Sequence, residues 1–376
     1  MEVRAFLRLM DLAEAMKNNT RHSWTSSGRH ESVAEHSWRL ALMAFFVKDE
    51  YPQLDMNRVI GMCLLHDMGE AFTGDIPAFE KTEEHEKTEK MQVKAWVESL
   101  PEPYRTEVGA LFREMEEKQS PEAKLYKALD KMEALIQHNE ADISSWIPLE
   151  YELQLTYGQA EARCSEYTKR LRAEIEADSR KKMETNSKKE QTAMKRLNEF
   201  MQLLSGTFDN SEQYEQMQKN GVEFPFAEHR NTVCNDKITG LPEDFIGKFL
   251  VEESRYTTQR GSNSSAHLFL FTPERDGILL TSYETPEGYE KATFTYETMG
   301  TVAFSSLKPS EKFTPTLFCE TNGVWEGASE SMFTPVVKFI LHERFSAEKL
   351  EVSESMEVGG KRTFGYDEAI VYRRKG

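Results

Sequence analysis

The spacing of apolar residues along the chain changes near residue 205. Before that position apolar side chains recur every three or four residues, as Val3, Phe6 and Met10 do, which places them on one side of an α-helix. After it, apolar residues recur at every second position, as Leu350, Val352, Met356 and Val358 do, which is the period of a half-buried strand. The pattern predicts a helical first half and a β-rich second half.

Several helices of the first half have recognisable ends. Ser32 and Glu35 form the pattern of a capping box, so a helix is expected to begin at Ser32. Gly69 follows an apolar stretch with helical spacing and predicts the end of that helix. Ser120 and Pro121 predict the start of another, because proline is favoured at the first helical position.

A long segment without helix breakers separates the two halves. Residues 159–205 contain neither Gly nor Pro, and residues 170–196 are dense in Lys, Arg and Glu. A solvated helix is the favoured interpretation, and a disordered charged linker is the alternative. We therefore expect a helical domain over residues 1–180, a charged helical connector over 181–196 and an antiparallel β-domain over 197–376, in a multidomain α + β chain.

The second half has the composition of a β-domain. Of the 20 Gly and 22 Phe residues, 14 Gly and 15 Phe follow residue 205, as expected where strands alternate with tight turns. Many short strands with turns between them are typical of an antiparallel barrel or sandwich. The expected strands cover 267–271, 277–283, 292–296, 337–341, 350–358 and 369–372, with a hairpin turn at Gly359-Gly360.

Charge and apolar run lengths exclude some classes of function. The chain has 47 Lys and Arg against 64 Asp and Glu, a formal net charge of −17, and this charge repels polymeric nucleic acid. The longest apolar run, Leu40–Val47, is too short to span a bilayer, so we expect no membrane interaction and a cytoplasmic location. Reduced thiols are expected because the four cysteines lack zinc or redox spacing.

The strongest chemical signal is the pair His66-Asp67 at the end of an otherwise apolar helix. Burying both side chains is costly unless a partner compensates them, and a divalent cation is the natural one. His36 and Asp130 lie in two other predicted helices, so three helices could each deliver a ligand. Taken singly, a histidine on a helix is more often a hydrogen-bonded packing residue than a ligand, and an aspartate is more often a solvated surface group.

The ordered set His36, His66-Asp67 and Asp130 resembles the signature of the HD-domain metal-dependent phosphohydrolases. The resemblance implies an all-α helical bundle in which these four residues hold one divalent metal ion (Mn, Co, Mg or Fe). HD enzymes with two metals need further histidines before the last aspartate, and only His85 lies in that interval.

Neighbouring segments are similar to the 5′-deoxynucleotidase branch of this family over about the first 180 residues. That branch removes the 5′-phosphate from deoxyribonucleoside monophosphates, so a small-molecule nucleotide substrate and a homodimer are implied. The segments that carry the similarity are Arg21, 31–37, 66–70, 73–77 and 127–131.

Further roles follow from the matching positions. Glu70 would act as the base or orienter of the attacking water, and Arg21 would clamp the phosphate. Asp75 would contact the sugar or assist the leaving oxygen. The best-known bacterial members have tryptophan directly after the arginine, where this chain has His22, so Trp24 is the candidate for that substrate contact and selectivity for deoxyribose over ribose stays open.

The second half resembles the CpcT/CpeT chromophore-lyase family. The similarity implies a calycin-like antiparallel β-barrel that could hold a small ligand, and we do not predict lyase activity from it. Two alternatives remain: an HD phosphohydrolase acting on another nucleotide or phosphorylated metabolite, or a ligand-binding barrel with the HD domain as scaffold. The segments that carry this similarity are 206–210, Gln213, 252–256, 282–286 and 365–373.

Overall fold

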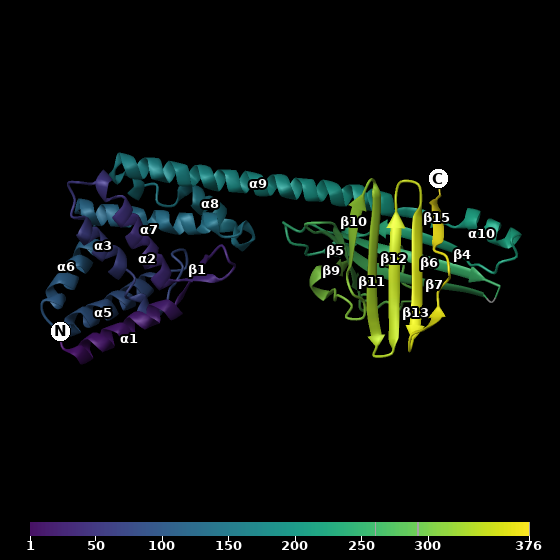
Figure 1. Ribbon diagram of the computed structural model, residues 1–376, viewed down its shortest axis with the longest axis horizontal. Helices are drawn as coiled ribbons and strands as arrows, with labels where there is room; N and C mark the ends of the chain where they lie inside the picture. The colour runs from purple at the N-terminus through teal and green to yellow at the C-terminus, as the bar shows by residue number, and fades with distance from the viewer. Residues whose placement is uncertain (260, 292, 376) are drawn as a thin grey trace. The chain divides into compact units, whose positions relative to one another are not determined.

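The chain folds into two compact units, Met1–Lys188 and Lys189–Gly376, shown in the computed structural model of Figure 1. Residues 1–259, 261–291 and 293–375 are described. The first unit is helical apart from one small hairpin, and the second is dominated by one antiparallel sheet. This arrangement confirms the predicted α + β fold class.

The core of the first unit lies between α2, α3 and α7. Leu40, Val59, Met62 and Leu129 from these helices are fully buried in one cluster. The helical elements are α1 (Val3–Asn18), α2 (Val33–Phe46), η1 (Lys48–Glu50), α3 (Met56–Leu65), α4 (Glu70–Thr73), α5 (Glu83–Ser99), α6 (Tyr104–Glu117), α7 (Pro121–Glu140), η2 (Ile143–Ser145), α8 (Pro148–Thr156), η3 (Glu161–Cys164) and α9 (Glu166–Leu204), and the hairpin is β1 (Thr20–Trp24) with β2 (His30–Ser32).

Two predicted helix starts are confirmed. The Ser32 hydroxyl accepts from the backbone N–H of Glu35, and the Glu35 carboxylate accepts from the backbone N–H of Ser32, which completes the capping box of α2. The Ser120 hydroxyl accepts from the backbone N–H of Ala123 at the start of α7, and Pro121 occupies the first turn of that helix. These caps fix the helices that carry two of the candidate metal ligands.

The predicted helix end at Gly69 is wrong. Helix α3 ends at Leu65, four turn residues follow, and Gly69 has φ −61°, so it does not provide the left-handed conformation of a helix stop. A Cβ at Gly69 would lie 2.6 Å from Glu89 Cγ of α5, so the glycine permits close packing of α5 instead. The early end of α3 places His66 and Asp67 in a turn.

The apolar residues of α1 form a helix as predicted, but they do not join the core. The exposed fractions are 72% for Val3, 49% for Phe6 and 47% for Met10, whereas Met16 near the end of the helix is buried. None of the described helices is both long and apolar enough to cross a membrane.

The second unit is a closed antiparallel barrel. Its strands follow the order β12-β11-β10-β8-β7-β6-β4-β3-β15-β13, and β13 pairs again with β12. Strand β14 forms a hairpin with the end of β13, where Met356, Glu357 and Val358 pair with it. The elements are β3 (Gly206–Asp209), α10 (Ser211–Lys219), β4 (Phe226–Val233), η4 (Asn235–Lys237), β5 (Ile238–Thr239), β6 (Lys248–Thr258), β7 (Gly261–Pro273), β8 (Ile278–Tyr283), β9 (Val302–Ala303), η5 (Phe304–Ser306), β10 (Thr316–Thr321), β11 (Val324–Thr334), β12 (Val337–Phe345), β13 (Leu350–Val358), β14 (Lys361–Phe364) and β15 (Ile370–Arg374).

Five of the six predicted strands are confirmed as parts of β7, β8, β12, β13 and β15. The sixth, over 292–296, is wrong for residues 293–296, which form turns; residue 292 lies outside the described residues. Phe294 is buried on the outer face of the barrel, and Thr295 and Thr298 exchange hydrogen bonds that curl the chain. The alternation of polar and aromatic residues in this segment therefore belongs to a loop that packs Phe294 against the barrel strands, and not to a strand.

The end of α9 fills one end of the barrel. Phe200 is fully buried, and its ring lies 4.9–5.5 Å from the rings of Phe271, Phe318, Trp325 and Phe345. Since α9 runs through the residues for which the sequence predicts a connector, its last turns also serve as a barrel plug.

Candidate metal centre

Three elements bring the four predicted ligands together. His36 projects from α2, His66 and Asp67 lie in the turn after α3, and Asp130 projects from α7. The Nε2 atom of His36 lies 3.3 Å from His66 Nε2, 3.2 Å from Asp130 Oδ1 and 3.8 Å from Asp67 Oδ2. His66 Nε2 lies 2.9 Å from Asp67 Oδ2 and 3.5 Å from Asp130 Oδ1. The ligand atoms therefore face one small volume.

Hydrogen bonds orient both imidazole rings. His66 Nδ1 lies 2.9 Å from the carbonyl oxygen of Cys63, and because a carbonyl can only accept, Nδ1 must carry the proton. His36 Nδ1 is bonded to the buried carboxylate of Glu133. Each ring thus presents Nε2 to the shared volume, which is the arrangement in which histidine binds metals.

The four side chains are strongly coupled electrostatically. Burial acts to lower the pKa of His66, but Asp67 and Asp130 outweigh it and raise that pKa to about 10. Burial acts to raise the pKa of Asp130, but Lys127, whose Nζ lies 2.7 Å from Oδ2, holds it well below its usual range. Two carboxylates that stay ionised supply the charge that a divalent cation requires.

The donor set fits a single divalent cation. A cation would displace the second ring proton of His66, and two imidazoles with two carboxylates then suit Mn, Co, Fe or Mg. Bonds of about 2.0–2.2 Å are compatible with ligand atoms this close to one another. His36, His66 and Asp67 also meet the geometric requirement of a three-ligand group, with ligand atoms within 4.8 Å of one another. These four residues could therefore hold the metal that the resemblance implies.

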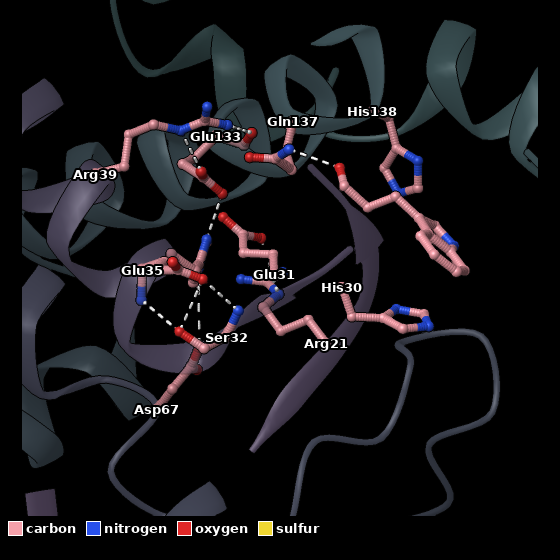
Figure 2. A network of polar contacts seen from close by, with 12 residues as sticks. Arg21, His30, Glu31, Ser32, Glu35, Arg39, Asp67, Glu133, Gln137 and His138 are labelled. Carbon is pink, nitrogen blue, oxygen red and sulfur yellow. Dashed lines mark hydrogen bonds and ion pairs between the residues drawn. The ribbon is translucent and has the colours of Figure 1, made fainter. Parts of the chain in front are cut away.

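Arg21 lies beside this group. It comes from β1, and its Nη1 atom is buried without a hydrogen-bond partner among the described residues. Its nearest ion pair is a loose one, 3.8 Å from Nε to Glu31 Oε2, and Figure 2 shows the two side chains next to each other. A buried guanidinium with an unused donor is a site for an anionic oxygen, such as a phosphate oxygen.

Glu70, which is buried, and Asp75, which is half-buried, are two acids near Asp67. Glu70 opens α4, is only 6% exposed, and its Oε2 has no hydrogen-bond partner among the described residues. Burial, Asp67 and Asp75 raise the pKa of Glu70 to about 10. Burial also raises the pKa of Asp75, although Arg21 opposes it. Asp75 disfavours ionisation of Glu70, whereas a hydrogen bond with Glu70 favours ionisation of Asp75, so one proton is readily held between the two acids.

Trp24 and His22 lie elsewhere on β1. The Trp24 ring packs on His30, with ring centroids 3.9 Å apart, and its backbone carbonyl accepts from Gln137 Nε2 at 2.7 Å. His22 Nε2 lies 3.2 Å from the buried carboxylate of Glu150. Whether Trp24 contacts substrate stays a prediction.

Three residues of the site were not predicted from the sequence. Glu133 joins His36 Nδ1 to Arg39, whose Nε donates at 2.6 Å, as Figure 2 shows for Arg39 and Glu133. Glu31 is buried close by, and burial followed by Glu133 raises its pKa to about 7. For Glu133, the sequence did offer one indication: it lies three residues after Asp130, which places both carboxylates on the same face of an apolar helix.

A cavity of about 710 Å³ lies between α5 and α6 and reaches His66. Tyr126 forms part of its wall, together with charged residues of both signs such as Lys81 and Arg113. Of the four candidate metal ligands only His66 lines this cavity, and Arg21, Glu70 and Asp75 do not.

The first unit is a helical HD domain: a family model described as HD domain matches residues 13–172, which include the four candidate metal ligands. The human protein 5′-deoxynucleotidase HDDC2 is 37% identical over 142 residues, covering 36% of this chain and 68% of that protein. 5′-Deoxynucleotidase hdd1 of Schizosaccharomyces pombe is 29% identical over 136 residues, 34% of this chain and 68% of the yeast protein. The chain belongs to the family of these HD-domain 5′-deoxynucleotidases.

A solved structure is also similar to the chain. The crystal structure of a predicted metal-dependent phosphohydrolase from Magnetospirillum magnetotacticum MS-1 is 26% identical, with a TM-score of 0.43, over 48% of this chain and 93% of that one. The likeness of the barrel to the CpcT/CpeT family stays a prediction.

Proposed function

We propose that the first unit hydrolyses the 5′-phosphate of (deoxy)ribonucleoside 5′-monophosphates, with one divalent cation held by His36, His66, Asp67 and Asp130. One observation carries the proposal: four ligand atoms converge beside Arg21, a half-buried arginine whose Nη1 donor is buried and unpaired. The names of the related 5′-deoxynucleotidases support the nucleotide substrate.

A bound cation supplies Lewis acidity to a phosphoryl oxygen and makes a nearby water more acidic. The protein has to place the phosphate, remove a proton from the attacking water and protonate the leaving 5′ oxygen. Arg21 binds the phosphate. Its Nη1 donor is buried and unpaired, and although burial acts to lower the pKa of the guanidinium, the carboxylates Glu133, Asp67, Glu31 and Asp130 raise it, so the side chain stays charged.

Glu70 receives the proton of the attacking water in this proposal. It lies one turn after Asp67, and its unpaired Oε2 is free to accept. The raised pKa of Glu70 opposes this role in the isolated protein, but positive charge next to a carboxylate lowers its pKa. Asp75, whose pKa is also raised, is placed to keep a proton for the leaving oxygen or to contact the sugar.

The experiment is a substrate panel on the full chain. Purified protein is incubated with dAMP, dGMP, dCMP, dTMP and the four ribonucleotides, in Mn²⁺, Co²⁺ or Mg²⁺, and released phosphate is measured. Asp67→Asn should reduce release by about a thousandfold or more, since it removes a ligand of the cation that lowers the barrier. The control Asp49→Asn changes an exposed aspartate of η1 and should retain activity. Release from other phosphate esters but from none of these nucleotides would contradict the proposed substrate.

A further inference from the structure

The barrel contains a cavity of about 610 Å³ on the open side of the Phe200 plug. Its wall is made by inward-facing residues of β6, β7, β8, β10, β11, β12 and β13. The volume is in the range of sites that enclose a small organic ligand. Nothing in the proposed phosphatase reaction uses this space.

Three glutamates from three strands line the cavity: Glu252 on β6, Glu343 on β12 and Glu354 on β13. Glu343 pairs with Val352, and Glu354 pairs with Leu341, so the two glutamates are diagonal neighbours on the same face of the sheet. Glu343 is nine-tenths buried, and its carboxylate has no hydrogen-bond or ion-pair partner among the described residues.

No described residue of the cavity wall provides a compensating positive charge. The wall contains neither Lys nor Arg among the described residues. Burial lowers the pKa of His267 in the wall to about 4, and it lowers the pKa of the neighbouring His229 to about 3, so both are neutral near pH 7. Glu252 Oε2 lies 3.7 Å from Nδ1 of the neutral His229, whereas Glu343 has no partner among the described residues. Burial and then Glu354 raise the pKa of Glu343 to about 8, so this carboxyl is mostly protonated near pH 7 without a ligand, and the positive charge of a bound ligand would favour its ionised form.

A metal ion does not fit this set. The groups of His, Cys, Asp and Glu with ligand atoms within 4.8 Å of one another, searched over the described residues, both lie in the first unit. The three glutamates of the barrel are not among these groups. An ammonium group with several N–H donors can contact separated carboxylates.

The outer part of the cavity is aromatic. The rings of Phe313, Phe333 and Phe339 lie 5.1–5.8 Å from one another, and all three line the cavity. Such a group of rings buries an apolar body and attracts a cation by its faces. The cavity therefore has an acidic middle and an aromatic outer section.

We propose that the barrel binds a small organic cation, an amine with an apolar body, whose ammonium group pairs with Glu343 and its neighbouring glutamates while the body lies against the three phenylalanines. This site is separate from the metal centre, and the proposal does not depend on the phosphatase activity.

The test uses three probes of matched shape on the full chain: 4-phenylbutylamine, 4-phenylbutan-1-ol and 4-phenylbutyrate. Calorimetric titration at pH 7.5 should show the amine binding roughly tenfold or more tighter than the alcohol, which is the range of a charge-assisted hydrogen bond. The carboxylate should bind most weakly, because its charge repels the glutamates.

Two variants assign the binding to the barrel. Glu343→Gln keeps the shape of the side chain and removes its charge, so the amine should lose most of its advantage over the alcohol. Glu354→Gln provides the same test if the first variant fails to fold. The control Glu326→Gln changes an exposed glutamate on the outer face of β11 and should leave the affinity unchanged.

The proposal is overturned if the amine fails to bind at millimolar concentration, or if amine and alcohol bind equally. It is also overturned if a folded Glu343→Gln or Glu354→Gln protein keeps the full preference for the amine. Phosphate release serves as a separate readout, because these variants should leave it unchanged.

Discussion

Glu133 has no predicted place in the reaction, yet it determines how His36 is presented. Its carboxylate binds His36 Nδ1 and Arg39 Nε, and His36 and the Glu133 side chain are almost completely buried. A sequence pattern identifies ligands by their spacing, but the partner of a ligand depends on which faces of α2 and α7 meet. Arg39 and Glu133 are 94 residues apart, so their contact could not be read from the sequence.

Glu133→Gln should weaken metal binding by about 10- to 100-fold, because the loss of a carboxylate behind a metal-binding histidine removes its orientation and its negative charge. Competition with a chromophoric chelator measures the dissociation constant. The matched control is Glu140→Gln, which changes the other carboxylate bonded to Arg39 and leaves His36 untouched. Equal metal affinity in wild type and Glu133→Gln would remove this role.

Arg21→Lys should reduce kcat/KM for a nucleotide by about 100-fold while the protein keeps its metal. Lysine preserves the charge but loses the second donor of the guanidinium, and a bond to a charged oxygen contributes roughly 1.5–3 kcal/mol. Steady-state kinetics and metal analysis of the same sample separate the two effects. Arg180→Lys, which alters an exposed arginine paired with Glu176, is the control and should behave as wild type. Loss of metal in Arg21→Lys would show that Arg21 supports the metal centre instead.

At the scale of elements, the sequence predicts where helices start better than where they end. The caps of α2 and α7 are local patterns, so Ser32 and Ser120 identify both helix starts. The helix end predicted at Gly69 is wrong because a glycine is needed there for the close approach of Glu89, a tertiary contact that no local pattern encodes. The strand predicted at 293–296 fails for the same kind of reason, since its alternation serves a loop on the barrel surface.

The barrel should lose stability as pH rises from about 5 to 8. Burial raises the pKa of Glu343 to about 8, above its usual value, so the folded barrel binds a proton that the unfolded chain releases. The stabilisation is complete below the unfolded pKa and is lost as pH rises through the folded one. The expected loss is at least about 1.4 kcal/mol, the equivalent of one pKa unit.

Thermal unfolding at pH 5.5, 7 and 8.5 measures this dependence. Glu343→Gln should flatten it and should raise the melting temperature of the barrel at pH 8.5, whereas Glu326→Gln should retain the slope. A Glu343→Gln barrel that is less stable at every pH would indicate that the carboxylate has a partner in the folded state.

At the scale of the whole molecule, the net charge of −17 hides how the acids are distributed. Several of them are buried, in the metal centre and in the barrel, where they prepare sites for positive charge. Composition reveals the excess of acid, but only the folded chain shows which acids face inward. Composition does not indicate the assembly state either. The homodimer stays a prediction, although α1 exposes apolar residues.

Two compact units should respond separately to their ligands. Removal of metal with EDTA should lower one calorimetric transition by roughly 5–10 °C, because a cation at 100 times its dissociation constant stabilises by about 2.7 kcal/mol. The second transition should stay in place, and 4-phenylbutylamine should raise only that one. A single transition that moves with both ligands would show that the units unfold together.

The most direct test of the central claim is phosphate release from dAMP as metal is returned to fully stripped protein. We predict no release without metal and a rise that saturates at one Mn²⁺ per chain, with no rise in Asp130→Asn. Release that persists after complete metal removal, or its absence with every divalent cation tried, would contradict the account.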